Sequence, residues 1–202
     1  MKYLSTHTSV RSFYLISFVL IPSLTIAQAT ARTYSFKEVG MTLTLPPEFK
    51  TIDSAKNADM NKAGQKLMKE ATDINVDMSS TKTLITAMKG TYNYISSTVT
   101  PFDSRKNGSY RKTNKMVKNA LYKTFSDKIP TAKIDSSTTT ITIDGLVFDK
   151  FRINIILGEK MTMHMFLLSR YYKVYDFGIT YLYVDDVTKA QIEAILKSCK
   201  FH

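Results

Sequence analysis

Residues 131–184 contain four runs in which apolar and polar side chains alternate, and this pattern constrains the fold more than any other feature of the sequence. Neighbouring side chains of a β-strand point to opposite faces, so alternation with a period of two predicts strands with one buried face. The pair Asp144-Gly145 separates the first two runs and predicts a two-residue hairpin turn, because both positions accept positive φ. Residues 158–160 join the second and third runs, and residues 170–172 are expected to form the next turn. Short connections make neighbouring strands antiparallel, so we predict a four-stranded meander.

The rest of the chain supplies further strands and three helices. The expected elements are a β-hairpin at 34–49 around Gly40, a helix at 57–73, strands at 82–90 and 91–102, and helices at 108–130 and 184–201, with polar loops at 50–58 and 103–109. No internal repeat or linker divides this series. We therefore predict a single α+β domain at residues 32–202, in which helices flank an antiparallel β-sheet.

The last two helices are each expected to bury one face, because their apolar residues recur at helical spacing. The predicted buried residues are Val117, Ala120, Leu121, Thr124, Phe125 and Ile129 in helix 108–130, and Thr188, Ile192, Ile195, Leu196 and Cys199 in helix 184–201. Cys199 is the only cysteine, and one thiol cannot form an intrachain disulfide. The fold must therefore be held together by its core, and a domain of this length is large enough for that.

The N-terminal segment has the pattern of a secretory signal peptide. Lys2 and Arg11 are the only charged side chains before Arg32, and an apolar run follows at 13–27. Alanines at positions 27, 29 and 31 then satisfy the small-x-small rule for cleavage. A retained membrane anchor is the alternative, but a span needs about 20 apolar residues and this run is shorter. We predict a cleaved signal at residues 1–31 and an exported protein, periplasmic or secreted.

The formal net charge of +11 indicates a preference for anionic partners. Ordinary solubilising charge is the alternative explanation. The charge is concentrated in helix 108–130, where Asp127 is the only acidic residue between 110 and 129. The candidate binding residues there are Arg111, Lys112, Lys115, Lys118 and Lys123. Lysine predominates over arginine, so we expect an unidentified protein or an anionic envelope polymer as partner and no specific recognition of nucleic acid.

The segment 158–170 raises the question of a metal site, because thioether and imidazole groups can bind copper. Met161, Met163 and Met165 alternate with His164, so a strand turns the histidine away from all three methionines. We interpret the methionines as core residues. The carboxylates are dispersed along the chain, and there is no G-x-S-x-G motif, calcium loop or glycine-rich phosphate loop. The sequence therefore identifies no catalytic residue, no metal ligand and no cofactor.

Three short motifs resemble the PsbP-like group, which includes photosystem II extrinsic proteins and the Ran-binding Mog-type import factor. The motifs are G-x-x-L-x-x-P at Gly40, Leu43 and Pro46, I-x-G-x-x-F at Ile143, Gly145 and Phe148, and S-x-x-F at Ser198 and Phe201. The resemblance implies an α/β/α sandwich with no shared catalytic residues, used mostly for binding or assembly. Two functions are carried forward: an exported non-catalytic binding or assembly module, and a hydrolase acting on an envelope or extracellular polymer. The hydrolase requires carboxylates gathered in a pocket, with shifted pKa values.

Overall fold

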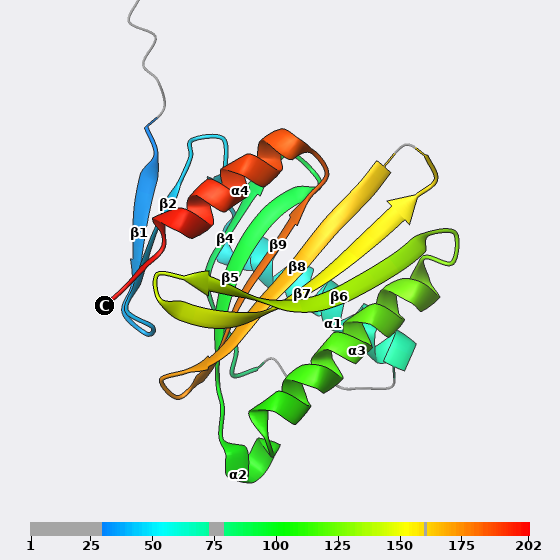
Figure 1. Cartoon of the computed structure of the whole chain (residues 1–202), viewed down its shortest axis with the longest axis horizontal. Coiled ribbons are helices and arrows are strands. Elements are labelled where there is room, and N and C mark those ends of the chain that lie inside the picture. Colours follow the sequence, from blue (N-terminus) through cyan, green and yellow to red (C-terminus); the bar gives the residue numbers. More distant parts are fainter. Residues whose placement is uncertain (1–29, 73–78, 160) are drawn as a thin grey trace, which may run out of the picture.

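The structure is a computed structural model that describes residues 30–72, 79–159 and 161–202. Within these residues, ten strands form two antiparallel sheets, and the larger sheet has the strand order β3-β4-β5-β9-β8-β7-β6 (Figure 1). Its strands are β3 (Lys50–Thr51), β4 (Lys82–Lys89), β5 (Asn93–Pro101), β6 (Lys133–Ile143), β7 (Leu146–Leu157), β8 (Met161–Tyr172) and β9 (Tyr175–Tyr183). The predicted signal peptide lies outside the described residues, except for positions 30 and 31, and stays a prediction.

The predicted four-stranded meander is present as β6 to β9. Asp144 and Gly145 form the first hairpin turn with φ values of 46° and 80°, as the Asp-Gly pair predicts. The third turn was misplaced by the sequence prediction. Residues 170–172 belong to β8, which stays paired with β9 as far as Tyr172 and Tyr175. The chain instead reverses at Lys173, which has a φ of 49°.

A second, smaller sheet joins the two ends of the domain. The predicted N-terminal hairpin forms β1 (Arg32–Phe36) and β2 (Met41–Leu45), and β2 also pairs with β10 (Lys200–Phe201). The turn between β1 and β2 contains Gly40, whose carbonyl oxygen accepts a 2.8 Å hydrogen bond from the backbone N–H of His202. The segment after the last helix is therefore fixed to the beginning of the domain. Neither β10 nor β3 was predicted, because a two-residue strand has no sequence period of its own.

Four helices are present among the described residues, and they lie on both faces of the large sheet. They are α1 (Ser54–Thr72), α2 (Ser104–Asn107), α3 (Tyr110–Lys128) and α4 (Asp186–Ser198). Figure 1 shows α4 in front of the sheet and α1 behind it. The short helix α2 replaces the loop expected at 103–109, because the Asp103 side chain caps it by accepting from the backbone N–H of Arg105. No helix in the described part of the chain is both long and apolar enough to cross a membrane.

Each face of the large sheet has its own core. The larger core lies under α4 and includes Phe148, Phe166 and Phe177 of the sheet, with Ile192 and Ile195 of the helix. The smaller core is formed by Phe151, Ile153 and Ile155 of β7, against which α3 packs. This arrangement confirms the predicted fold class, an α+β domain with an antiparallel sheet between helices. In α4, the predicted buried stripe is also confirmed, and Cys199 is 1% exposed.

The buried face of α3 confirms most of the prediction. The predicted residues Ala120 and Thr124 are buried, and Leu121, Phe125 and Ile129 are half-buried against the smaller core. The helix also buries two polar residues that were not predicted to be buried, Asn114 and Lys118. Lys118 was expected among exposed cations, yet it is 9% exposed. Its burial is possible because Asp149 of β7 lies opposite and pairs with the ammonium group at 3.3 Å. Hydropathy alone cannot anticipate this pair, since the two residues are 31 positions apart.

Candidate functional site

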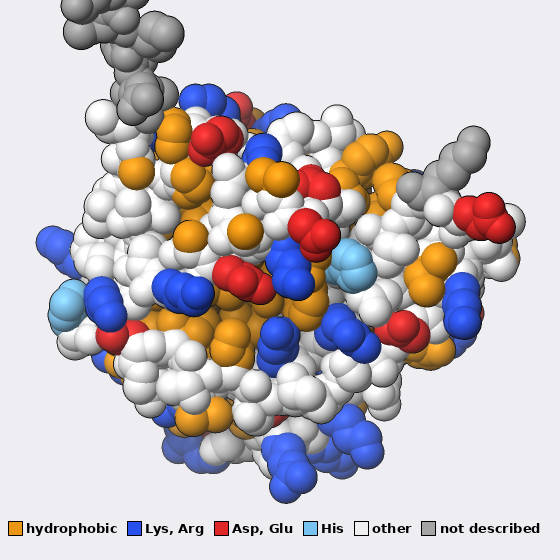
Figure 2. Space-filling view, turned by 45° about the horizontal axis from the view of Figure 1, so that its top comes forward, with side chains coloured by type: hydrophobic (Ala, Val, Ile, Leu, Met, Phe, Trp, Pro, Cys, Tyr) orange, Lys and Arg blue, Asp and Glu red, His pale blue; other side chains and the backbone are white. Residues whose placement is uncertain are grey.

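A cleft of about 470 Å³ opens between α4 and the large sheet, and it is the candidate functional site. This volume lies within the range of small-molecule sites. Figure 2 shows hydrophobic side chains exposed at the bottom of a hollow on this side of the molecule, with charged side chains around them. The cleft is lined by Ile141, Thr142, Ile143 and Asp144 of β6 and its turn, Lys150 of β7, Phe166 of β8, Tyr181 and Tyr183 of β9, and Lys189, Ile192, Glu193, Leu196 and Lys197 of α4.

The floor of the cleft is aromatic because of the register between β8 and β9. Phe166 is paired with Tyr181, and His164 is paired with Tyr183, so their side chains share one face of the sheet. The Phe166 ring stacks on Tyr181 at 4.7 Å and on Tyr183 at 5.7 Å. His164 extends the row, with its ring 5.0 Å from that of Tyr183. These contacts fix the rings and give the cleft a rigid apolar base.

Two phenol groups add polarity to this base. Burial raises the pKa of Tyr181, and the neighbouring Tyr183 and Glu193 raise it further. Burial likewise raises the pKa of Tyr183, assisted by Glu193 and Asp186. Both hydroxyls are therefore protonated at neutral pH, and neither hydrogen-bonds to another residue of the described chain. Each can donate a hydrogen bond to a ligand in the cleft.

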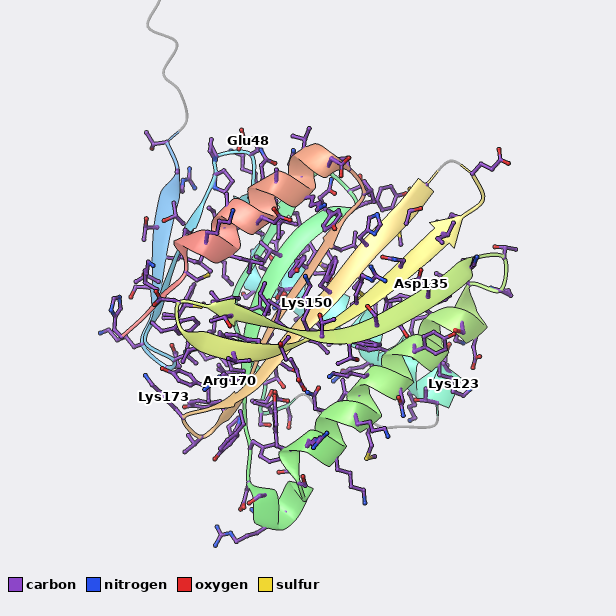
Figure 3. All side chains as sticks on the ribbon, viewed as in Figure 1. Glu48, Lys123, Asp135, Lys150, Arg170 and Lys173 are labelled. Atoms are coloured by element: carbon purple, nitrogen blue, oxygen red, sulfur yellow. The ribbon has the colours of Figure 1, made fainter. Side chains whose placement is uncertain are left out.

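Three lysines surround the cleft without an ion-pair partner among the described residues. Lys150 projects from β7, and its Nζ lies 4.9 Å from the centre of the Phe166 ring in a cation–π contact. Figure 3 shows Lys150 near the middle of the sheet face. Lys189 and Lys197 are exposed on α4, two turns apart, with Glu193 between them. The cleft therefore carries more positive than negative charge at its rim.

The two carboxylates of the cleft do not form a catalytic pair. Asp144 accepts a 2.8 Å hydrogen bond from the backbone N–H of Phe201 and pairs with Lys200 at 2.9 Å, and these contacts hold its pKa below the usual value. A general acid needs a raised pKa instead. Glu193 is exposed on α4. The arrangement expected for a hydrolase, carboxylates with raised pKa values gathered in a pocket, therefore has no support in this cleft.

His164 lies on the face predicted for it, away from the methionines. Met163 and Met165 pack against the smaller core on the opposite face of the sheet. The Nδ1 atom of His164 is 2.8 Å from Oδ1 of Asn154, whose amide nitrogen donates to Asp135. Burial and the nearby positive charge of Arg152 lower the pKa of His164, which favours the neutral ring. Across the described residues, no group of three or more His, Cys, Asp or Glu side chains is arranged to hold a metal ion.

The basic residues predicted on helix 108–130 lie on the other face of the sheet and are not all together. Arg111, Lys115 and Lys118 line a groove between α3 and β6. Lys112 and Lys123 are exposed outside this groove, and Lys123 pairs with Asp127. The cleft under α4 was missed by the sequence analysis. Its residues come from five elements spread over positions 141–197, and each one alone resembles an ordinary core or surface residue.

The solution structure of the cyanobacterial PsbP protein CyanoP from Synechocystis sp. PCC 6803 is similar to this structure. The match has a TM-score of 0.52 and 12% sequence identity, and it covers 91% of this chain and 99% of that one. The chain has a PsbP-like fold. The match confirms the resemblance to the PsbP-like group that the three short motifs suggested. Because the sequence identity is only 12%, the similarity concerns the fold alone.

A second solved structure, the Ran-binding protein Mog1p of Saccharomyces cerevisiae, matches with a TM-score of 0.40 and 7% identity, covering 86% of this chain and 96% of that one. No family model matches the sequence, and no curated protein sequence matches it. The function must therefore be argued from the residues of the cleft and the groove.

Proposed function

We propose that this PsbP-like protein is an exported, non-catalytic binding module that holds an acidic saccharide in the cleft under α4. The observation that carries the proposal is the combination of an aromatic floor with three lysines that have no ion-pair partner in the described chain. The N-terminal signal pattern and the net charge of +11 support an anionic partner outside the cytoplasm. The sequence leaves two expected partners, an anionic envelope polymer and an unidentified protein. Of these two, we propose the anionic polymer.

Each part of the cleft matches one property of an acidic sugar. The apolar face of a pyranose ring packs well on an aromatic and aliphatic surface such as Phe166 and the half-buried Ile141. The hydroxyls of Tyr181 and Tyr183 can exchange hydrogen bonds with sugar hydroxyls. The ammonium groups at the rim provide charge-assisted hydrogen bonds for a carboxylate. A neutral ligand would use only the floor, so we expect an acidic saccharide to bind more tightly than a neutral one of the same size.

The test is calorimetric titration of the purified protein with an oligosaccharide of uronic acids, against the neutral oligosaccharide of the same length. The double substitution Lys189→Gln and Lys197→Gln is expected to weaken binding of the acidic ligand about tenfold, because a hydrogen bond to a charged group contributes about 1.5–3 kcal/mol and these lysines are partly screened by solvent. The matched control is Lys62→Gln with Lys69→Gln on α1, which removes the same charge from exposed positions far from the cleft.

Three outcomes would contradict the proposal: equal affinity for the acidic and neutral ligands, an equal loss in both double variants, or no binding at low salt. Equal loss would mean that net charge alone attracts the ligand. A pull-down from the envelope fraction would favour the protein partner instead if it recovered a protein that uronic acids do not displace from the wild type.

A further inference from the structure

The groove on the opposite face of the sheet is a second site of different chemistry. It has a volume of about 460 Å³ and lies between α3 and β6. Arg111, Lys115 and Lys118 line it from the helix, and Ser136 and Thr138 line it from the strand. Phe151, which also lines the groove, belongs to the smaller core, so the groove and the cleft under α4 are separated by the sheet.

The helix presents its three cations to the groove because of their spacing. Arg111, Lys115 and Lys118 are four and three residues apart, so they project from one side of α3 toward β6. Arg111 and Lys115 are exposed at the rim of the groove, and Lys118 is buried at its inner end.

Buried contacts fix the inner end of the groove. Oδ2 of Asp149 accepts a 2.9 Å hydrogen bond from the Asn114 side chain and pairs with the ammonium group of Lys118 at 3.3 Å. The only acidic side chain in the groove is therefore neutralised by one lysine that is itself buried. Arg111 and Lys115 make no ion pair within the described chain, so two positive charges are available to a ligand.

The strand adds hydroxyl groups to the same hollow. Ser136, Ser137 and Thr138 line it, and none of their side chains hydrogen-bonds to another described residue. Ser136 and Thr138 are paired with Ile153 and Phe151 on the α3 side of the sheet, whereas Ser137 is paired with Arg152 and faces the other side. The groove therefore combines a guanidinium, an ammonium and two hydroxyls as unused donors. A cluster of donors with a net positive charge complements a small oxyanion that can accept several hydrogen bonds.

We propose that the groove between α3 and β6 binds a phosphate group. A guanidinium donates two parallel hydrogen bonds to phosphate oxygens, a lysine supplies a point charge, and serine or threonine hydroxyls satisfy the remaining oxygens. The sequence alone argued against specific phosphate recognition, because most of the cations in this helix are lysines. The groove changes that conclusion by placing the one arginine of α3 beside the hydroxyl-bearing strand. The phosphate is either free or carried by an envelope polymer or lipid headgroup.

The test is a titration of the isotope-labelled protein with inorganic phosphate, and separately with glycerol 3-phosphate, followed by amide chemical shifts. Sodium chloride at the same ionic strength provides the reference. Saturable shifts confined to α3 and β6 are expected for both phosphates. Shifts that chloride reproduces, or that spread over the whole surface, would overturn the proposal. Tighter binding of glycerol 3-phosphate than of inorganic phosphate assigns the site to a phosphorylated polymer or headgroup, and the reverse order assigns it to free phosphate.

The same helix offers matched variants. Arg111→Ala with Lys115→Ala is expected to weaken phosphate binding at least tenfold, because it removes both unpaired cations of the groove. Lys112→Ala with Lys123→Ala removes two exposed cations of the same helix and is expected to change the affinity less than twofold. A similar loss in both pairs would show that the helix attracts phosphate by its charge alone and would refute the site. The variant Ser136→Ala with Thr138→Val keeps every charge, so a several-fold loss there supports recognition by the strand hydroxyls, whereas no change counts against the proposed geometry.

Discussion

The contact between Gly40 and the C-terminal segment allows a prediction of stability with a worked magnitude. Gly40 has a φ of +62°, and a Cβ built on it would lie 2.4 Å from the backbone oxygen of His202. Alanine in this conformation costs about 1–2 kcal/mol. The oxygen of His202 must also move away, which disturbs the hydrogen bond from the His202 N–H to Gly40, a bond that contributes about 1 kcal/mol. Gly40→Ala is therefore expected to destabilise the domain by about 2–3 kcal/mol.

Thermal unfolding followed by circular dichroism measures this effect. One kcal/mol corresponds to about 2–4 °C for a domain of this size, so Gly40→Ala should lower the Tm by about 4–12 °C. Gly145→Ala is the control, because Gly145 also has positive φ but a Cβ there meets nothing within 4 Å. Deleting residue 202 removes the clash, so in that background Gly40→Ala should cost no more than Gly145→Ala. Equal costs for the two alanines in the full chain would refute the reasoning.

Three further predictions concern the core and its titratable groups. Phe148 is 0% exposed and packs edge-on against Phe177, so Phe148→Ala should lower the free energy of unfolding in urea by about 3–5 kcal/mol; a loss below 1 kcal/mol would contradict its place in the core. Burial raises the pKa of Asp176, although the hydroxyl of Tyr110 donates to it at 2.9 Å. The folded state therefore binds the Asp176 proton more tightly than the unfolded state does, and the stability of the fold falls as pH rises through the folded pKa. Asp176→Asn should stabilise the protein at pH 7, where the wild-type carboxyl is charged in the unfolded state. Below the unfolded pKa of about 3.8, the substitution should give no such gain. Burial raises the pKa of Cys199 to about 11, so alkylation by iodoacetamide at pH 8 should be slow in the folded protein and fast in urea; fast labelling of the folded protein would show an accessible thiolate.

The large sheet was predictable because patterns among residues that are adjacent in the sequence mark most of its strands and turns. In the meander, the period of two persists through each strand, and Asp144-Gly145 marks a turn that few other dipeptides form as well. The turn at Lys173 was misplaced because no glycine, asparagine or proline marks it. Lys173 adopts positive φ because the strands on either side of it are paired as far as Tyr172 and Tyr175. This pairing is not visible in the local sequence of the turn.

The functional surfaces were less predictable because they are assembled from distant residues. The aromatic floor of the cleft depends on the register that places Phe166 beside Tyr181, and register is not visible in either strand alone. The prediction of a basic helix identified the correct element for the groove. It could not divide the five cations into those that face β6 and those that face solvent, because that division depends on how α3 packs.

The pairing of β10 with β2 has a consequence for when the molecule can finish folding. The small sheet needs residues 200–201 beside residues 41–42, so it closes only after nearly the whole domain has emerged from the ribosome. Contacts between such distant segments form late, since the intervening loop must first be ordered. Until then the β1–β2 hairpin has an unpaired edge along β2, so the small sheet acts as a late lock on a domain whose larger sheet can already be in place.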